Sequence, residues 1–187
     1  MKVITCPDEY TKSEKDIFCF LGGGITNCPN WQKEVINILQ KVDPEHLVVF
    51  NPRRDNFPIN NPNASDEQIQ WEYKYLECAD IFSMYFCESE SDQPICMYEL
   101  GRNIERMNNR YMINVDRHVI ISSEKNYKRV QDVVIQTKLA IHTDIVNADA
   151  DYISHAKDIL FAYLICRYGH SSNFREAYNK LKEKWPY

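Results

Sequence analysis

Short apolar runs alternate with segments of helical periodicity along most of this chain, and this alternation limits the possible folds more than any other feature. The apolar runs are rich in residues that favour strands, and Gly, Pro or Asn ends several of them. They predict strands at residues 17–21, 47–50, 81–86, 118–121 and 145–146. Strands that alternate with helices form a mostly parallel sheet, so we expect an α/β fold with helices on both faces of that sheet.

Capping residues mark the starts of several helices between these strands. Asn30 can cap a helix that begins at Trp31, and Pro94 marks the start of another. Ser65 with Gln68 fits a capping box for a third helix. The remaining expected elements are a short arm or edge element and three further helices, at residues 1–15, 127–140, 153–164 and 174–181.

Length and composition favour one ordinary globular domain over residues 1–187. The chain is 44% hydrophobic and 26% charged, which provides for a sizeable core. Its net charge of -5 disfavours a nucleic-acid polymer as partner. The N-terminus has no apolar signal core, and no apolar run is long enough to cross a bilayer, so we expect no membrane association.

The cysteines predict a reducing, cytoplasmic setting. There are seven, an odd number, and no two of them have C-x-x-C spacing. This pattern disfavours a disulfide framework and a zinc site, and we expect no metal.

Ligands of parallel α/β folds bind outside the carboxyl ends of the strands. Gly22-Gly23-Gly24 follows the first expected strand, Asn51 follows the second, and residues 87–94 follow the third. Glycine backbone can approach a ligand closely, and its N–H groups can bind anions. A tight strand-to-helix turn explains the same glycines equally well.

Two glutamates are candidates for chemistry. Glu99 lies in the early turns of the helix that starts at Pro94, among apolar neighbours, and its side chain should lean toward the ligand-binding edge. A carboxylate held there can act as a nucleophile or a base. Glu72 lies on the preceding helix, and two carboxyls in different environments can divide acid and nucleophile roles. Solvated surface positions are the ordinary alternative for both.

Other polar residues have less specific patterns. Arg53 and Arg54 can hold a phosphate or form a solvated pair. Asp80 is most simply a turn or cap residue. None of the five histidines pairs with a Ser or Cys in a motif for nucleophilic catalysis.

Taken together, these segments resemble the nucleoside 2-deoxyribosyltransferase superfamily, in its nucleoside 2-deoxyribosyltransferase-like branch. The resemblance runs from residue 17 to about 146, and the helical residues 150–187 follow it as an extension. The matching segments occur in the same order as in that superfamily, at residues 20–25, 31–32, 50–54, 70–73, 79–80, 94–102 and 127–139.

The resemblance implies a Rossmann-like or flavodoxin-like parallel sheet of about five strands. It implies that Glu99, in the Glu-Leu-Gly motif, attacks the anomeric carbon of a deoxynucleoside, with Glu72 in the same site. No cofactor is implied. We expect the substrate to be bound by a set of residues around this pair, namely Phe20, Gly22, Gly23, Gly24, Asn51, Arg53, Asp80 and Asp92. Phe20 stands where superfamily members have a Tyr.

Three functions agree with this resemblance. The leading one is transfer of a 2-deoxyribosyl group between nucleobases through a covalent Glu99–sugar intermediate. The second is hydrolysis of the N-glycosidic bond of a nucleoside or nucleotide. The third is a nucleotide-binding module without catalysis, which Phe20 favours. The resemblance also implies a homo-oligomer, with the Asp132–Gln136 face or the two C-terminal helices as contacts.

Overall fold

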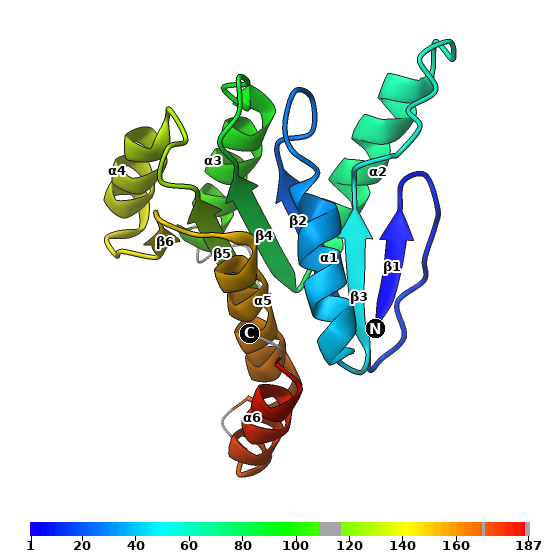
Figure 1. The fold of residues 1–187 in the computed structure, drawn as a ribbon. Helices are drawn as coiled ribbons and strands as arrows, with labels where there is room; N and C mark the ends of the chain where they lie inside the picture. The colour runs from blue at the N-terminus through cyan, green and yellow to red at the C-terminus, as the bar shows by residue number, and fades with distance from the viewer. Residues whose placement is uncertain (109–116, 170, 186–187) are drawn as a thin grey trace.

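The computed structural model describes residues 1–108, 117–169 and 171–185 of the chain. Within these residues, six strands form one parallel sheet in the order β1-β3-β2-β4-β5-β6 (Figure 1). The strands are β1 Lys2–Thr5, β2 Ile17–Gly23, β3 Leu47–Asn51, β4 Ile81–Phe86, β5 His118–Ser123 and β6 Val146–Asn147. The helices are α1 Trp31–Val42, α2 Ala64–Cys78, α3 Pro94–Asn108, α4 Val130–Ile141, α5 Tyr152–Tyr168 and α6 Asn173–Lys184.

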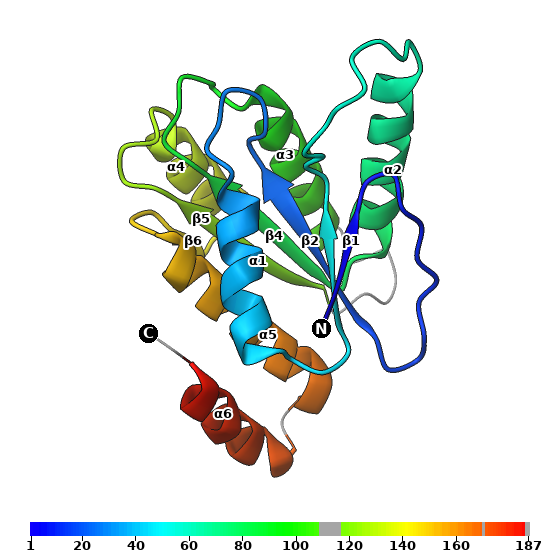
Figure 2. The ribbon, with the colours of Figure 1, turned by 45° about the vertical axis from the view of Figure 1, so that its right-hand side comes forward.

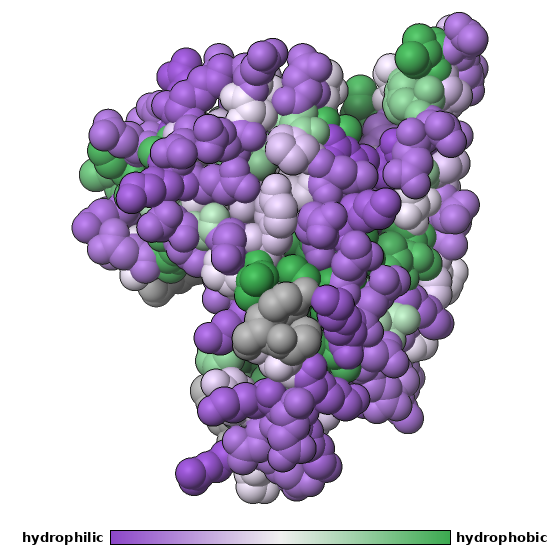
Figure 3. Space-filling view, viewed as in Figure 1, coloured by the Kyte–Doolittle hydropathy of each residue, from purple (hydrophilic) through white to green (hydrophobic). Residues whose placement is uncertain are grey.

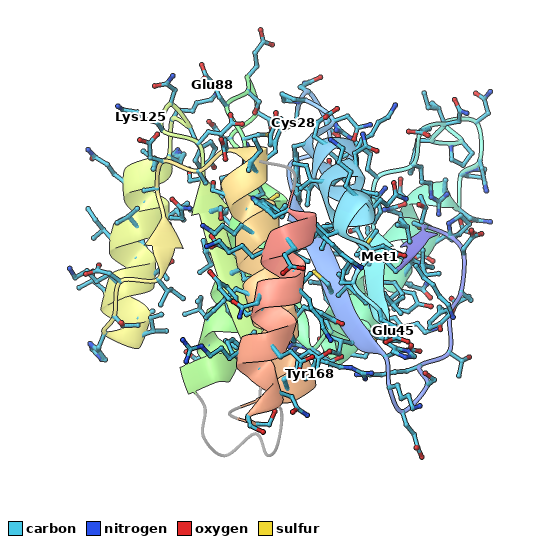
Figure 4. The ribbon with its side chains drawn as sticks, turned by 60° about the horizontal axis from the view of Figure 1, so that its bottom comes forward. Met1, Cys28, Glu45, Glu88, Lys125 and Tyr168 are labelled. Atoms are coloured by element: carbon cyan, nitrogen blue, oxygen red, sulfur yellow. The ribbon has the colours of Figure 1, made fainter. Side chains whose placement is uncertain are left out.

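The strand order reverses between β2 and β4. From β2 the chain adds β3 on one side, and then β4, β5 and β6 on the other. This is the flavodoxin-like order, with β1 as an extra edge strand outside β3, so the predicted fold class is confirmed. Figure 4 shows Cys28, Glu88 and Lys125, from the loops that follow β2, β4 and β5, along one edge of the molecule. Ligands of such sheets bind at this carboxyl edge, next to the reversal.

Two hydrophobic cores cover the two faces of the sheet (Figure 2). α1 and α5 pack on one face, and α2, α3 and α4 pack on the other. Alternate strand residues supply the two cores, as the two-residue period of a strand requires. Cys19 and Leu21 of β2 face the first core, while Phe18 and Phe20 face the second. The outer surface over α1 is largely hydrophilic (Figure 3).

Local capping explains where two helices begin. The Asn30 side chain accepts a hydrogen bond from the Lys33 backbone N–H at 3.2 Å, which confirms the predicted cap of α1. Asp151 and Ser154 form a full capping box at the start of α5. The capping box predicted for Ser65 and Gln68 is wrong.

α2 begins two residues earlier than that box requires. Its cap residue is Asn63, which makes no side-chain capping bond. The side chain of Gln68 turns instead toward the Pro52 carbonyl and Glu72, since both are acceptors within its reach. These hydrogen bonds set the position of the Gln68 side chain, although the local sequence fits a capping box.

The C-terminal helices differ in their contribution to the core. α5 buries residues along its full length against the sheet and α1. α6 buries no residue completely, and its apolar side chains pack partly exposed against α5. Among the described residues, no helix combines the length and apolar character needed to cross a bilayer. All seven cysteines are free thiols.

Candidate active site between α2 and α3

Glu99 lies half-buried in the second turn of α3. Cys96 and Leu100, on either side of it, are buried against the sheet, which fixes the rotation of the helix. Burial raises the pKa of the Glu99 carboxyl to about 7, the Glu72 carboxylate adds to the rise, and Arg102 opposes it. Glu72 of α2 is therefore close enough to Glu99 for its charge to act on that carboxyl.

Glu72 occupies the middle of α2 and is also half-buried. Burial raises its pKa, while a hydrogen bond from Gln68 and the charge of Arg54 act in the opposite direction. Gln68 Nε2 donates to Glu72 Oε1 at 2.7 Å, four residues apart on the same face of the helix. Glu72 thus has a fixed donor on one oxygen.

The two carboxyls form a coupled pair. Each is harder to ionise than a solvated glutamate, because burial disfavours the charged form. A negative charge on Glu72 also raises the proton affinity of Glu99. Near neutral pH, Glu99 is therefore partly protonated and partly ionised.

Ion pairs and hydrogen bonds join α2 to α3 below this pair. Glu77 of α2 lies 3.2 Å from Arg102 and 2.6 Å from Arg106 of α3. Arg117 donates to three carbonyls at the end of α2 and to Asn103 Oδ1 of α3. We call Glu77, Arg102, Arg106 and Arg117 the helix brace. Toward their N-terminal ends the two helices diverge (Figure 2).

Phe20 lies in the core beneath the two helices. It is only 1% exposed, and its ring centroid lies 6.3 Å from that of Trp71, one residue before Glu72. A phenyl ring has no hydroxyl, so Phe20 cannot form a hydrogen bond with Glu99. Its ring packs in the core with Trp71 instead.

The glycine segment is required by close packing. Gly22 and Gly23 are the last residues of β2, and only Gly24 lies beyond the strand. A Cβ at Gly23, whose φ is +150°, would overlap the Tyr85 carbonyl oxygen and the Trp31 ring. The Trp31 indole N–H donates to the Gly24 carbonyl at 3.0 Å. The glycines let α1 and β4 approach the end of β2.

Gln93 occupies the space between the glycine segment and the start of α3. Its side chain is 3% exposed, and its Oε1 accepts the Gly24 N–H at 3.2 Å. Its Nε2 donates to the Cys87 carbonyl at 2.7 Å. The N–H group that was expected to face a ligand is therefore already bonded to a neutral amide.

Arg53 and Asn51 shape the loops at the carboxyl edge. The Arg53 guanidinium donates to Gln32 Oε1 and to three backbone carbonyls, at Ile25, Cys28 and Pro29. Asn51 Oδ1 accepts the Arg53 N–H at 3.1 Å, which forms an Asx turn. Arg53 thus fastens the loop between β2 and α1 to the end of β3.

Arg54 lies nearer the carboxyl pair. It donates to Cys6 Sγ at 2.9 Å and pairs with Glu67 at 2.7 Å. Its side chain is 7% exposed, and its positive charge opposes the burial that raises the pKa of Glu72.

Asp80 and Asp92 do not join the carboxyl pair. Asp80 lies at the amino end of β4, where it pairs with Lys12 at 2.5 Å and accepts the Phe18 N–H. Asp92 is an exposed loop residue that pairs with Lys128 at 3.1 Å. Of the ten residues expected from the sequence, Glu99, Glu72 and Phe20 lie together, and the others support the surrounding loops or lie elsewhere.

Sequence reasoning missed Gln68 and the helix brace. The spacing of Gln68 and Glu72, four residues apart on one helix, could have indicated their contact. The brace joins residues from different elements, which spacing along the chain does not reveal. Among the described residues, no three His, Cys, Asp or Glu side chains are grouped as metal ligands.

Comparison with known proteins identifies the family. A search of curated proteins finds no match. The family model described as nucleoside 2-deoxyribosyltransferase like matches residues 16–117, which is more than half of the chain. That segment begins just before β2 and contains both helices of the carboxyl pair. The chain therefore belongs to the nucleoside 2-deoxyribosyltransferase-like family.

Proposed function

We propose that this protein transfers a 2-deoxyribosyl group between nucleobases by double displacement. The ionised carboxylate of Glu99 attacks C1′ of a 2′-deoxynucleoside, and the bond between C1′ and the base nitrogen breaks with its electrons leaving on the base. The departing base takes a proton from a nearby acid or from water. A second base then attacks C1′ from the opposite side and releases Glu99. If water attacks instead, the outcome is hydrolysis.

The observation that carries this proposal is the half-buried Glu99 carboxyl beside Glu72. The transition state of glycosidic cleavage has positive charge on the sugar. A carboxylate in apolar surroundings stabilises that charge more strongly than a solvated one, because water does not screen it. With its pKa raised to about 7, Glu99 still supplies an ionised fraction at neutral pH. Glu72 is then available to hold the leaving base or the sugar hydroxyls.

The surroundings favour an uncharged nucleoside over its 5′-monophosphate. Gln93 already accepts the Gly24 N–H, and Arg53 is engaged by four acceptor groups. Arg54 is engaged by Cys6 and Glu67. A phosphate would have to break these bonds, so we expect 2′-deoxynucleosides to react faster than their monophosphates in a direct kinetic comparison. A preference for the monophosphates would contradict this part of the proposal.

The central experiment measures base exchange and the covalent adduct. The protein is incubated with a 2′-deoxynucleoside with and without a free acceptor base, and the products are separated by chromatography. We expect exchange, and intact-protein mass spectrometry should detect a deoxyribosyl adduct. Glu99→Gln should abolish both, whereas Glu105→Gln, an exposed position on the same helix, should retain both.

The outcomes separate the competing functions. Base release that does not depend on an acceptor identifies a hydrolase. No turnover, combined with a nucleoside affinity that Glu99→Ala leaves unchanged, identifies a binding module. Loss of activity in Glu105→Gln equal to that in Glu99→Gln would show that the effect is not specific to the carboxyl pair.

The same function is expected to occur in a homo-oligomer. Four large apolar side chains are exposed on α2 and α3 near the carboxyl pair, and they are Ile69, Tyr73, Ile95 and Tyr98. Ile95 and Tyr98 are 65% and 69% exposed, and a second copy of the chain would remove them from water. Sedimentation velocity should show an oligomer that Ile95→Asp combined with Tyr98→Asp dissociates. A monomeric wild type would contradict this expectation.

A further inference from the structure

One acceptor beside the carboxyl pair has no hydrogen-bond partner among the described residues. It is Gln68 Oε1, and the atom is buried. A buried polar atom without a partner destabilises a fold, because it has lost its hydrogen bonds to water. Most such atoms in folded proteins have a partner in the protein, in ordered water or in a ligand. Gln68 Oε1 belongs to the side chain that donates to Glu72, so a ligand bound beside Glu72 is a candidate partner for this oxygen.

The neighbours of Gln68 fix which way its amide is turned. Nε2 donates to the Pro52 carbonyl at 2.6 Å and to Glu72 Oε1 at 2.7 Å. A backbone carbonyl can only accept, so the nitrogen must face Pro52 and the amide cannot be flipped. The amide oxygen is thereby held away from Pro52, as an acceptor that only a donor from outside this set can satisfy.

The geometry points to Gln68 as a specificity-determining residue, whose Oε1 accepts a hydrogen bond from a donor on the substrate. This assignment rests on the proposed function, because the substrate is the nucleoside cleaved at Glu99. The donor is an O–H of the deoxyribose or an N–H of the base, since both types occur in a nucleoside. Nε2 has a separate role, in which it positions the Glu72 carboxyl.

The test compares substrates that lack one donor each. The parent probes are 2′-deoxyadenosine and thymidine, and the one cleaved faster is used. The sugar arm uses its analogues without the 3′-hydroxyl or the 5′-hydroxyl. The base arm uses 2′-deoxyadenosine against the analogue with hydrogen in place of the 6-amino group, or thymidine against its N3-methyl analogue. Each analogue is measured as kcat/KM with the wild type, Gln68→Met and Gln70→Met.

Gln70→Met is the matched control, because Gln70 is exposed on the same helix and donates to Asp66 instead. We expect wild type and Gln70→Met to lose about tenfold in kcat/KM with one analogue, the usual effect of one neutral hydrogen bond. Gln68→Met should distinguish that analogue from its parent by less than about twofold. Gln68→Met should also have a lower kcat with every substrate, because it lacks the Nε2 donor to Glu72.

Each outcome is decisive. If Gln68→Met retains the wild-type discrimination for every analogue, Oε1 accepts no hydrogen bond from the substrate and the assignment is wrong. If Gln68→Met does not fold, Gln68→Asn replaces it, since the shorter amide withdraws Oε1 from the same position. Cleavage of neither parent by the wild type overturns the proposed function together with this assignment. Cleavage without any tenfold analogue effect overturns only the assignment.

Discussion

Glu99 combines a surface-accessible position with an environment that resists its ionisation. It is half-buried between Cys96 and Leu100, and its pKa is raised to about 7. Such a carboxyl changes charge in the pH range where enzymes are usually assayed, whereas a solvated glutamate is fully ionised there. Its titration should therefore be visible both in the rate of reaction and in the stability of the fold.

The rate prediction follows from the need for an ionised nucleophile. In the wild type, kcat/KM should rise with pH and level off above about pH 7, since free Glu99 ionises there. Glu72→Gln removes the neighbouring negative charge, so the pKa of Glu99 falls and the acid limb moves to lower pH. A pH–rate profile of both proteins checks this. An acid limb at the same pH in both would show that Glu72 does not act on Glu99.

The stability of the fold should change with pH in the opposite direction to the rate. Between about pH 4.5 and 7 the unfolded state has ionised Glu99 while the folded state still holds the proton, so folded-state stability falls as pH rises. Gln cannot ionise, and Glu99→Gln should therefore have a larger free energy of unfolding than wild type at pH 8, by about 2 kcal/mol after allowance for partial exposure. At pH 4 the two should agree. Urea unfolding at both pH values measures the difference, and a variant less stable than wild type at pH 8 would contradict it.

Some residues of the site can be predicted from sequence and others cannot. Glu99 and Glu72 stand out because each lies in a motif on an expected helix. The function of Gln93 could not be read, because its left-handed backbone, with φ of +50°, turns the side chain back onto Gly24. The prediction that Gln68 belongs to a capping box was wrong. A glutamine is common both at the start of a helix and in an (i, i+4) side-chain pair, so the sequence does not distinguish the two roles.

At the scale of elements, α5 is tied to the middle of the sheet by one buried histidine. His155 is fully buried, with Nε2 at 2.7 Å from Ser83 Oγ of β4 and Nδ1 at 2.8 Å from Ser122 Oγ of β5. Burial lowers the pKa of this imidazole to about 3. A neutral ring donates to one serine hydroxyl and accepts from the other, while burial without a neighbouring negative charge disfavours the charged ring.

This arrangement predicts an acid-sensitive contact between α5 and the sheet. Below pH 6.5 the unfolded state binds a proton at His155 that the folded state excludes, so stability falls as pH drops. The contribution between pH 7 and pH 4 is about 3 kcal/mol. His155→Gln should lower stability at pH 7 but show a flatter decline toward pH 4 in thermal melts. His142→Asn, at an exposed helix end, is the control and should decline as wild type does.

Sequence predicts the core elements of the fold well and its edges less well. The central strands β2, β3 and β4 are continuous apolar runs because both faces are covered, and such runs are easy to recognise. β1 and β6 are short and only partly buried, so their composition carries little information. β1 becomes a strand because β3 offers a free edge for pairing, which residues 2–5 alone do not reveal.

At the scale of the whole molecule, the segment after the family match completes the core. α5 buries Ala156, Ile159, Leu160, Tyr163 and Leu164 against the sheet face that α1 leaves open. Each large side chain contributes about 1.5–3 kcal/mol, and their sum is comparable to the 5–15 kcal/mol by which whole domains are stable. α6 contributes only partly buried contacts.

Two truncations should therefore behave differently. Removal of residues 171–187 deletes α6 and should lower the melting temperature while leaving a folded sheet. Removal of residues 151–187 also deletes α5 and should leave a protein without a cooperative transition. Circular dichroism melts of both proteins distinguish these results. Cooperative unfolding of the shorter protein near the wild-type temperature would show that α5 is dispensable.

The helix brace has a consequence for the design of variants. Its ion pairs and hydrogen bonds join α2 to α3 on the side away from the carboxyl edge, through Glu77, Arg102, Arg106 and Arg117. The brace residues and the first turns of both helices are therefore separate from Glu72 and Glu99. Libraries that vary the unbraced first turns of both helices should tune acceptance of bulky modified bases while the reacting carboxyls stay intact.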